Sequence, residues 1–537
     1  MEDYNVARFL AEAAKQSPGK PAVVLPGRRS ETLDFSTLDQ RVDGTVRYFH
    51  YAGIKPGQRV LLLVKPGLPL IQSAFALFRL GAIPVVIDPG LGRKAFLKAA
   101  AASQVESVVA IPLAALLCRL LGGFLKRCRI VVIGSAGANK TIQALAGETP
   151  RITDRFAADA PAAILFTSGS TGAAKGVLYT HGMFNAQVAL LQKLFHFEPG
   201  EIDFPMLPVF TLFNPAFGMT TVVPPMPPGK PARANFKRLI HTINHHGVTN
   251  SFGSPVLWRG ITRACSATGT TLPSLRRVLI AGAPMPPSWL AALMPHLPHA
   301  RVYSPYGATE ALPVSLIDHR TVLEETAEAT TRGAGTCVGM PCAGVSVKII
   351  AITPDVLNTW DEAVELPQGE IGEIVVSGAA VTREYDGLPE ATRRAKIDKG
   401  NVRWHRMGDC GYLDTQGRLW FCGRVAERVT SLTGTLYTDC CEAPFLVHPQ
   451  VSRVALIGIG AEGKQTPALV VEPKPDSFPR KGKKRQRFCD ELKAIAQSLP
   501  LTRPIERFYF ERALPVDVRH NAKIHRLQLR QRYSHAD

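Results

Sequence analysis

The chain has 537 residues, which is too long for one ordinary core and predicts two or more domains. Hydrophobic residues make up 46% and charged residues 20%, a balance that excludes a disordered chain. The 63 Lys and Arg against 44 Asp and Glu give a net charge of +19, which suits an anionic substrate, a nucleic acid, a membrane surface or an acidic partner. Because the charge is spread along the chain and no module combining basic and aromatic residues is evident, we expect a small anionic substrate and no nucleic acid.

The cysteines and the apolar runs indicate the compartment. The ten cysteines show no CxxC pair and no His-Cys ligand spacing, so free thiols are expected rather than disulfides or zinc. The amino terminus is acidic and lacks the layout of a signal peptide. The longest uncharged apolar run, Val108 to Cys118, is too short to span a bilayer. We therefore expect a soluble, cytoplasmic protein whose membrane contact is at most peripheral.

The first 135 residues alternate between strand-like and helix-like patterns. This alternation predicts a layered α/β architecture with largely parallel sheets. The expected strands are 22–25, 59–64, 83–87 and 130–133, and the expected helices are 35–52 and 70–80.

Residues 111–129 mix leucines with Arg119, Lys126, Arg127 and Arg129. A basic amphipathic segment of this kind can lie on a membrane or dock a partner. An ordinary packed helix with a solvated face is the more frequent structure, and it is what we expect here. The basic stretch 481–487 is likewise expected to be a solvated loop or helix start, with an electrostatic contact to a partner or an anionic surface as the alternative.

A buried strand is predicted at Ala162–Phe166, and it runs into a loop rich in glycine and hydroxyl residues, 167–176. Glycines let backbone N–H groups approach phosphate oxygens, hydroxyls add donors, and Lys175 supplies a compact cation. The spacing of the lysine differs from the GxxxxGK[ST] nucleotide loop. We therefore predict a phosphate-binding loop of another type, with these residues: Thr167, Ser168, Gly169, Ser170, Thr171, Gly172 and Lys175.

The loop sequence TSGSTGAAKGV resembles the signature loop of the adenylate-forming superfamily, which contains acyl-CoA synthetases, peptide-synthetase adenylation domains and luciferases. The resemblance implies ATP and Mg²⁺, and activation of a carboxylate as acyl-AMP with release of pyrophosphate. It also implies an α/β fold with a large N-terminal domain of layered sheets and helices and a small mobile α+β C-terminal domain. We place the two domains at 1–424 and 425–537.

The region 205–231 is rich in aromatic residues, methionine and proline and carries almost no charge. In the superfamily this region lines the acyl pocket, and an apolar lining suits a hydrophobic acid. Relatives usually read LPxFH here, whereas Thr211 replaces the histidine in this chain. A plain core is the alternative. The expected pocket residues are Phe210, Thr211, Phe213 and Ala311.

Two further stretches, RRVLIAGAPM and VYSPYGATE, read as strands that end in superfamily motifs. By resemblance, Thr309 touches the phosphate region and Glu310 helps to hold Mg²⁺, for which a carboxylate is a suitable oxygen ligand. Tyr306 can stack on a purine. The resemblance assigns the adenine side of the site to Gly282, Ala283, Pro284, Tyr306 and Gly307.

The segment HRMGDCGYLD resembles the superfamily's TGD motif, with Met407 in the threonine position. Asp409 would then accept hydrogen bonds from the ribose hydroxyls. Arg424 matches the ribose-binding arginine, and Glu427 and Arg428 lie at the expected hinge. Near the end of the chain, Lys523 occupies the place of the catalytic lysine, but Ala522 stands where relatives usually have glycine. Since alanine tolerates positive φ poorly, that loop is expected to differ in conformation.

The stretches 203–226, 306–315 and 411–429 look closest to the β-lactone synthetases of bacterial long-chain olefin biosynthesis. That resemblance implies a 2-alkyl-3-hydroxy fatty acid whose own hydroxyl attacks the acyl-adenylate, and it allows a complex with other enzymes of olefin biosynthesis. An intramolecular nucleophile has a high effective molarity, so no CoA is required. Two alternatives remain, a long-chain fatty acid–CoA ligase and a catalytically inactive nucleotide-binding or scaffold protein.

Overall fold

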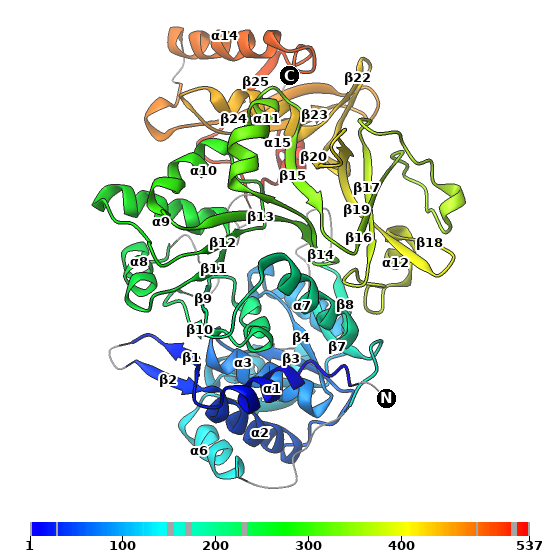
Figure 1. Cartoon of the computed structure of the whole chain (residues 1–537). Helices are drawn as coiled ribbons and strands as arrows, with labels where there is room; N and C mark the ends of the chain where they lie inside the picture. The colour runs from blue at the N-terminus through cyan, green and yellow to red at the C-terminus, as the bar shows by residue number, and fades with distance from the viewer. Residues whose placement is uncertain are drawn as a thin grey trace.

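The computed structural model describes residues 3–27, 30–121, 123–147, 155–166, 174–227, 233–479, 482–516 and 523–534 (Figure 1). The predicted phosphate-loop residues 167–172 and Ala522 lie outside these ranges. Among the described residues, no helix has the length and apolar character needed to cross a bilayer. The ten cysteines are free thiols.

A six-stranded sheet forms the N-terminal end of the molecule. Its strands are parallel except for β8, which pairs antiparallel with β7. In sheet order they are β6 (Arg129–Val132), β5 (Ser107–Ala110), β3 (Arg59–Leu63), β4 (Ile83–Val86), β7 (Pro161–Phe166) and β8 (Gly176–Thr180). The helices of this part are α1 (Arg8–Gln16), α2 (Phe35–Tyr51), α3 (Leu68–Leu80), α4 (Arg93–Ala102), α5 (Pro112–Leu121), α6 (Ala136–Leu145) and α7 (His181–Phe195), with the short turns η1 (Pro89–Leu91) and η2 (Gly123–Arg127).

Local sequence signals explain where these helices start and stop. Asp34 caps α2 by accepting a hydrogen bond from the Thr37 amide, and Gly81 ends α3 in the left-handed conformation, with φ of 78°. The predicted helices 35–52 and 70–80 and the strands near 59, 83 and 130 are confirmed. Residues 22–25 also form a strand, but it joins the second sheet rather than this one.

The second sheet is long and mixed. Its central strands β9 to β13 are mostly parallel, and antiparallel strands continue it toward the C-terminal domain. In sheet order the strands are β16 (Val345–Ile350), β17 (Gly372–Gly378), β19 (Val402–Leu413), β20 (Leu419–Arg424), β15 (Thr336–Pro341), β14 (Ala311–Asp318), β13 (Arg301–Ala308), β12 (Arg277–Ile280), β11 (Asn250–Gly253), β9 (Ile202–Pro205), β10 (Thr220–Val222), β1 (Pro21–Leu25) and β2 (Glu31–Asp34), with β18 (Lys396–Lys399) paired to β19.

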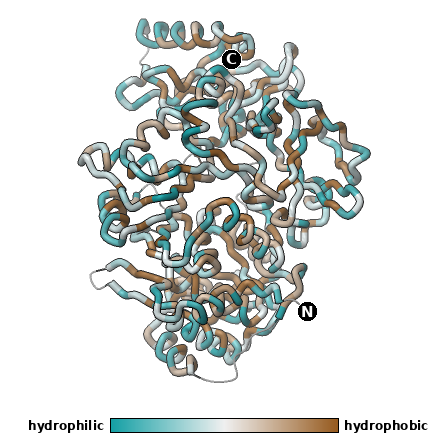
Figure 2. The backbone as a smooth tube through the Cα atoms, viewed as in Figure 1, coloured by the Kyte–Doolittle hydropathy of each residue, from teal (hydrophilic) through white to brown (hydrophobic). Residues whose placement is uncertain are grey.

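Helices pack on this sheet and complete the predicted layered α/β architecture. Figure 2 shows hydrophobic segments along the inner strands, where the buried cores lie. The helices and helical turns are η3 (Pro208–Phe217), α8 (Phe236–His245), α9 (Pro255–Thr268), α10 (Pro287–Leu293), η5 (Met294–His296), η6 (Thr321–Thr326), α11 (Ala327–Thr331), η7 (Trp360–Glu362) and α12 (Pro389–Ala395).

The C-terminal part has its own three-stranded sheet and its own core, built on Phe445, Leu456, Leu469 and Leu492. This α+β arrangement lies at the opposite end of the molecule from the six-stranded sheet (Figure 1). Its elements are η8 (Val425–Glu427), β21 (Val429–Ser431), β22 (Gly434–Leu436), α13 (Thr438–Glu442), η9 (Ala443–Val447), β23 (Val451–Ile459), β24 (Thr466–Pro473), η10 (Pro475–Ser477), α14 (Lys483–Ser498), β25 (Arg507–Phe510) and α15 (Arg526–Tyr533).

The domain boundary predicted at 424/425 stays a prediction, and it falls between β20 and η8. Just beyond it, the buried guanidinium of Arg526 joins α15 to two carboxylates. It donates to Glu442 at 2.7 and 2.8 Å and to Glu427 at 2.9 Å. Because all three side chains are largely buried, removing the arginine would leave two carboxylates without their counter-charge.

We therefore expect Arg526→Met to destabilise the C-terminal part by about 3–5 kcal/mol, the usual effect of breaking a buried ion pair. Hydrogen exchange of the β23 and β24 amides in the full chain measures this as faster opening. The control is Arg532→Met in the same helix. Arg532 is half-exposed and pairs with Glu511 at the surface, so its loss should cost at most about 1 kcal/mol. Equal exchange rates in the two variants would contradict the expectation that the buried cluster stabilises the C-terminal part more than the surface pair does.

Candidate functional site

Tyr306 on β13 reaches across the sheet to Asp409 and Arg424, which lie on the neighbouring strands β19 and β20. Asp409 and Arg424 are direct partners across the antiparallel pair of β19 and β20. The Tyr306 hydroxyl donates to Asp409 Oδ2 at 2.6 Å, and Arg424 Nη1 lies 2.7 Å from Oδ1. Burial and the nearby carboxylate raise the pKa of Tyr306, so its hydroxyl remains a donor, and the carboxylate raises the pKa of Arg424.

One oxygen of this cluster is left without a hydrogen bond. Asp409 is 3% exposed, and although Oδ1 is close to the arginine, the contact lacks hydrogen-bond geometry. A buried carboxylate oxygen of this kind is expected to have a donor. A ribose hydroxyl is a donor of the required type, so the cluster fits a nucleotide.

Glu310 lies in a two-residue turn between β13 and β14. Ala308 and Ala311 pair across the hairpin, and Thr309 and Glu310 form its turn. Gly307 is required just before the turn, because a Cβ there would overlap the carbonyl oxygen of Ala311. The predicted strand ending at the YGATE motif is thus confirmed as a strand, and its last residues form a tight hairpin.

Residues distant in sequence hold this turn. The Tyr179 hydroxyl donates to the Thr309 carbonyl oxygen, and the Tyr385 hydroxyl donates to Glu310 Oε1 at 2.8 Å. The Thr382 amide donates to the Glu310 carbonyl oxygen, also at 2.8 Å. The carboxylate of Glu310 is therefore held by the Tyr385 hydroxyl, and the main chain of the turn is held by Thr382 and Tyr179.

Thr382 and Tyr385 belong to a connecting segment, Val381–Asp386, that runs between the hairpin and β8. It forms bridges to Ala311 at one end and to Val177 at the other. The ammonium of Lys175 lies 4.8 Å from the centre of the Tyr385 ring, so the segment brings Lys175 and Glu310 to the two sides of one tyrosine. Lys175 and Glu310 thus both contact Tyr385, a residue that sequence reasoning missed.

Lys396 and His405 form a second buried group that the sequence did not reveal. The Lys396 ammonium donates to the Thr382 carbonyl oxygen and lies 3.4 Å from its hydroxyl. Burial lowers the pKa of Lys396 to about 7, and burial together with Lys396 holds the pKa of His405 well below its usual range. Lys396 thus holds the connecting segment at Thr382, and His405 lies opposite Lys396 in the strand pair β18–β19.

The predicted adenine-side loop, Gly282 to Pro284, follows β12. Because β12 and β13 are parallel neighbours, this loop and Tyr306 emerge at the same sheet edge. Gly282 has φ of 101°, which favours glycine. The structure therefore brings the loop toward the Tyr306 cluster.

The predicted acyl-pocket residues lie along a row of aromatic rings. Phe210 stacks on Phe252 with ring centres 3.8 Å apart and lies 6.1 Å from Phe213, which contacts Phe184 at 6.3 Å. Phe184 stacks on Tyr179, the residue that holds Thr309. The row leads from η3 to the hairpin turn, where Ala311 is buried.

Thr211 lies in the same helical turn, η3, and is buried, with no hydrogen-bond partner for its hydroxyl among the described residues. Asn214, one turn later, donates to Asp203 at 2.9 Å and to Thr221 at 2.7 Å, which fastens η3 to the sheet. Burial raises the pKa of Asp203 to about 7 despite the hydrogen bond from Asn214.

Lys523 is half-buried and lies three residues before α15, next to the Val516–Ile524 bridge. Among the described residues, no hydrogen bond or ion pair joins it to Glu310 or to the Asp409 cluster.

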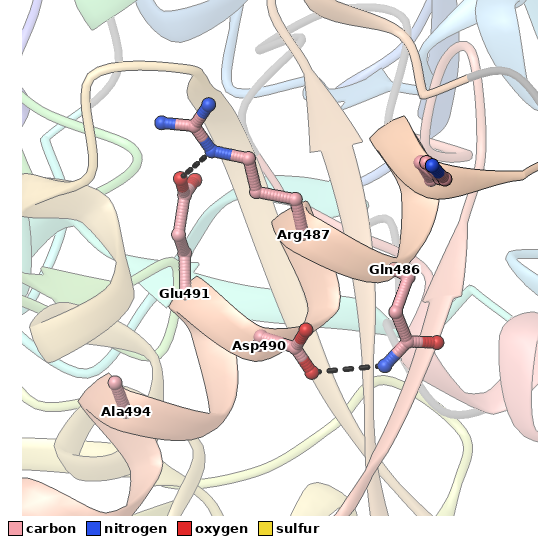
Figure 3. A pocket seen from close by; sticks show the side chains of 6 residues that line it. Gln486, Arg487, Asp490, Glu491 and Ala494 are labelled. Atoms are coloured by element: carbon pink, nitrogen blue, oxygen red, sulfur yellow. Dashed lines mark hydrogen bonds and ion pairs between the residues drawn. The ribbon is translucent and has the colours of Figure 1, made fainter.

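The open hollow on α14 in Figure 3 lies apart from this site. Its polar groups are paired along the helix, Arg487 with Glu491 at 3.0 Å and Gln486 with Asp490 at 2.9 Å, and none of the predicted site residues lines it. The basic stretch predicted at 481–487 is the exposed start of this helix from residue 482 on.

Comparisons with known proteins identify the family of this chain. The family of AMP-binding enzymes matches residues 10–386. The chain belongs to the AMP-binding enzyme family. It is 41% identical, over 98% of its length and 96% of the relative's, to an olefin β-lactone synthetase of Xanthomonas campestris. A protein of the same name from Stenotrophomonas maltophilia is also 41% identical, with coverage of 98% and 97%. The predicted family and the predicted likeness to β-lactone synthetases are confirmed.

Solved structures confirm the predicted fold class. ATP-bound MatB from Rhodopseudomonas palustris superposes with a TM-score of 0.81 at 18% identity, covering 100% of both chains. The amide bond synthetase McbA from Marinactinospora thermotolerans gives a TM-score of 0.80 at 22% identity, covering 99% of both chains.

In the described ranges of this chain, no group of three or more His, Cys, Asp or Glu side chains is placed so that it could bind a metal ion.

The raised pKa of Asp203 predicts a pH-dependent stability. The folded pKa of about 7 exceeds the unfolded value of 3.8, so this contribution is complete below pH 3.8 and is lost as the pH rises to 7. Asp203→Asn keeps the acceptor for Asn214 but cannot ionise. The unfolding free energy of wild type minus that of the variant should fall by about 1.4 kcal/mol per pH unit between pH 4 and 7 and stay level above pH 7. Urea titrations across this range measure it, and parallel curves would contradict a protonated Asp203.

Proposed function

We propose that this chain activates a 2-alkyl-3-hydroxy fatty acid with ATP as acyl-AMP and closes the product to a β-lactone, releasing AMP and pyrophosphate. The observation that carries the proposal is the 41% identity to olefin β-lactone synthetases over nearly the whole chain. The arrangement of Asp409, Glu310 and Lys175 supports the adenylation half of the reaction.

We assign the nucleoside to the sheet edge formed by β12 and β13. Tyr306 stacks on the adenine opposite the loop Gly282–Pro284, and Asp409 accepts hydrogen bonds from the ribose hydroxyls at Oδ1, which lies near Arg424 but accepts no hydrogen bond from the described residues. Arg424 holds Asp409 in position, since it forms an ion pair with it across the strand pair. The cluster therefore binds and orients the nucleotide without reacting.

We assign the phosphates to the loop 167–172 and to Lys175, with Thr309 on the same side. Glu310 would hold Mg²⁺ together with phosphate oxygens, because the described residues offer no cluster of protein ligands and Mg²⁺ binds well to one carboxylate plus phosphates. Bound there, the ion would neutralise charge on the triphosphate. Tyr385 positions both Lys175 and Glu310 for this task.

The chemistry needs no protein nucleophile. A carboxylate oxygen of the substrate attacks the α-phosphorus, and the bond to pyrophosphate breaks. The 3-hydroxyl oxygen then attacks the acyl carbon, the hydroxyl proton is lost, and the bond to AMP breaks. Lys523 supplies positive charge to the carboxylate and α-phosphate in the first step, after the C-terminal domain brings it to the site.

The aromatic row suits the hydrocarbon part of the substrate. Phe210 and Phe213 present ring faces in an uncharged surrounding that ends near Ala311, at the hairpin that bears Glu310. Thr211, which replaces the usual histidine, brings a small buried hydroxyl to this region. The pocket therefore binds mainly by apolar area, with few polar contacts.

The product of the reaction tests the proposal. With ATP and a 2-alkyl-3-hydroxy acid, we expect AMP, pyrophosphate and a lactone that has lost one water relative to the acid. Added CoA should change neither the rate nor the product, because ring closure is intramolecular. The matched control is the same acid without the 3-hydroxyl, which should give no lactone. An acyl-CoA as main product would favour a fatty acid–CoA ligase, and no acid-dependent pyrophosphate would favour an inactive nucleotide-binding protein.

The role of Lys523 gives a separate prediction. Lys523→Ala should lower acid-dependent pyrophosphate release by at least about 100-fold, as the loss of a positioned charge does, while ATP affinity changes less than about threefold. Calorimetry measures the ATP affinity and a coupled assay the pyrophosphate. The control is Lys464→Ala, which removes an exposed lysine from the same part of the chain. Loss of ATP binding in parallel with turnover would refute the assigned role.

A further inference from the structure

Helix α5 turns its leucines away from the protein. The buried side chains of this helix are the small ones, Ala115 and Cys118, which pack in the core beneath β5 and β6. Four leucines are exposed instead, Leu113 at 65%, Leu116 at 52%, Leu117 at 47% and Leu120 at 59%. The segment is a packed helix with a solvated face, as expected, but the solvated face is apolar rather than polar.

These leucines form one continuous strip, which we call the leucine face. Their spacing of three and four residues places them in neighbouring positions along one side of the helix. A helix at the surface of a soluble domain normally buries such a strip. An exposed apolar patch rimmed by polar residues marks a contact with a protein or a membrane.

The surroundings of the leucine face are basic. Arg119 on α5 and Lys126 and Arg127 on η2 are exposed, and η2 approaches α4, where Leu97 lies near Gly123 and Lys98 is exposed. Between residues 91 and 130, Glu106 is the only acidic residue, against these basic residues: Arg93, Lys94, Lys98, Arg119, Lys126, Arg127 and Arg129. The apolar strip therefore lies in a field of positive charge.

We propose that α5 docks this protein onto the surface of an anionic lipid bilayer. In this arrangement the leucine face enters the boundary between headgroups and acyl chains, and Lys126, Arg127 and Arg119 lie against lipid phosphates. A helix of ten residues is too short to span the bilayer and can only lie on it. A second copy of the chain would bring the same positive charge against itself, which disfavours self-association through this face.

The docking surface is separate from the proposed catalytic residues. α5 contacts β5 and β6, and β6 is the edge strand of the six-stranded sheet, whereas Lys175 follows β7 toward the opposite edge. Docking through α5 therefore depends on the exposure of its leucines and on the surrounding positive charge. It does not depend on which acid the enzyme activates.

Vesicle binding of the full chain tests the proposal. Vesicles of phosphatidylcholine with about 30% phosphatidylglycerol should sediment the protein, and phosphatidylcholine alone should bind it at least tenfold more weakly. Leu113→Gln with Leu120→Gln should weaken binding to the anionic vesicles at least tenfold, as expected when two leucines no longer enter the lipid. Lys126→Gln with Arg127→Gln should weaken it by about tenfold or more and reduce its sensitivity to salt.

Control variants replace exposed residues of the same kind elsewhere. Leu432→Gln, at 80% exposed the most accessible leucine of the β21–β22 hairpin, should leave vesicle binding unchanged, as should Lys483→Gln with Lys484→Gln at the start of α14. The variants are folded if their thermal unfolding midpoints are unchanged and if they release pyrophosphate with a short-chain acid at the unchanged rate. Absence of vesicle binding, binding that survives the α5 substitutions, or loss caused by the control substitutions would each overturn the proposal. A dimer that forms without lipid and that dissociates when Leu113→Gln is combined with Leu120→Gln would overturn the proposal. It would favour a second copy of the chain as the partner of the leucine face.

Discussion

The position of one carboxylate, that of Glu310, depends on residues outside its own hairpin. A two-residue turn leaves its side chains free, so the Tyr385 hydroxyl donates to the carboxylate, while the Thr382 amide and the Tyr179 hydroxyl hold the main-chain carbonyls of Glu310 and Thr309. The same connecting segment bridges to β8, which follows Lys175. The two large sheets therefore come together at this turn. This junction sets the positions of Lys175 and Glu310, the charged groups proposed to act on the phosphates.

The sequence predicted those parts of the site that lie within one short motif. Asp409 and Arg424 were found because each stands in its own recognisable stretch, and the strand pair then places them face to face. Tyr385 was missed because its partner lies far away in sequence: 75 residues separate it from Glu310. Lys396 is only 14 residues from its partner Thr382, but a lysine in the short strand β18 carries no local pattern that indicates a buried contact.

Periodicity also has a limit that α5 makes clear. The leucine spacing correctly indicates a helix with one apolar side, but a pattern along the chain cannot say whether that side turns inward. Here Ala115 and Cys118 allow close approach to the sheet, so the small side is buried and the leucines point outward. The alternation of strands and helices, by contrast, predicted the parallel sheet well, since each expected strand from 59 to 133 lies in it.

The buried cluster of Arg526 has a consequence for the motion that we propose for the C-terminal part. Arg526 is three residues beyond Lys523, and its guanidinium is bound to Glu442 and to Glu427, the third residue after the predicted boundary at 424/425. If the C-terminal part turns about a pivot at residues 425–428, as we propose, the buried cluster links that pivot rigidly to the segment that carries Lys523. Substitutions at the pivot should therefore alter the timing of adenylation even though they touch neither ATP nor the acid.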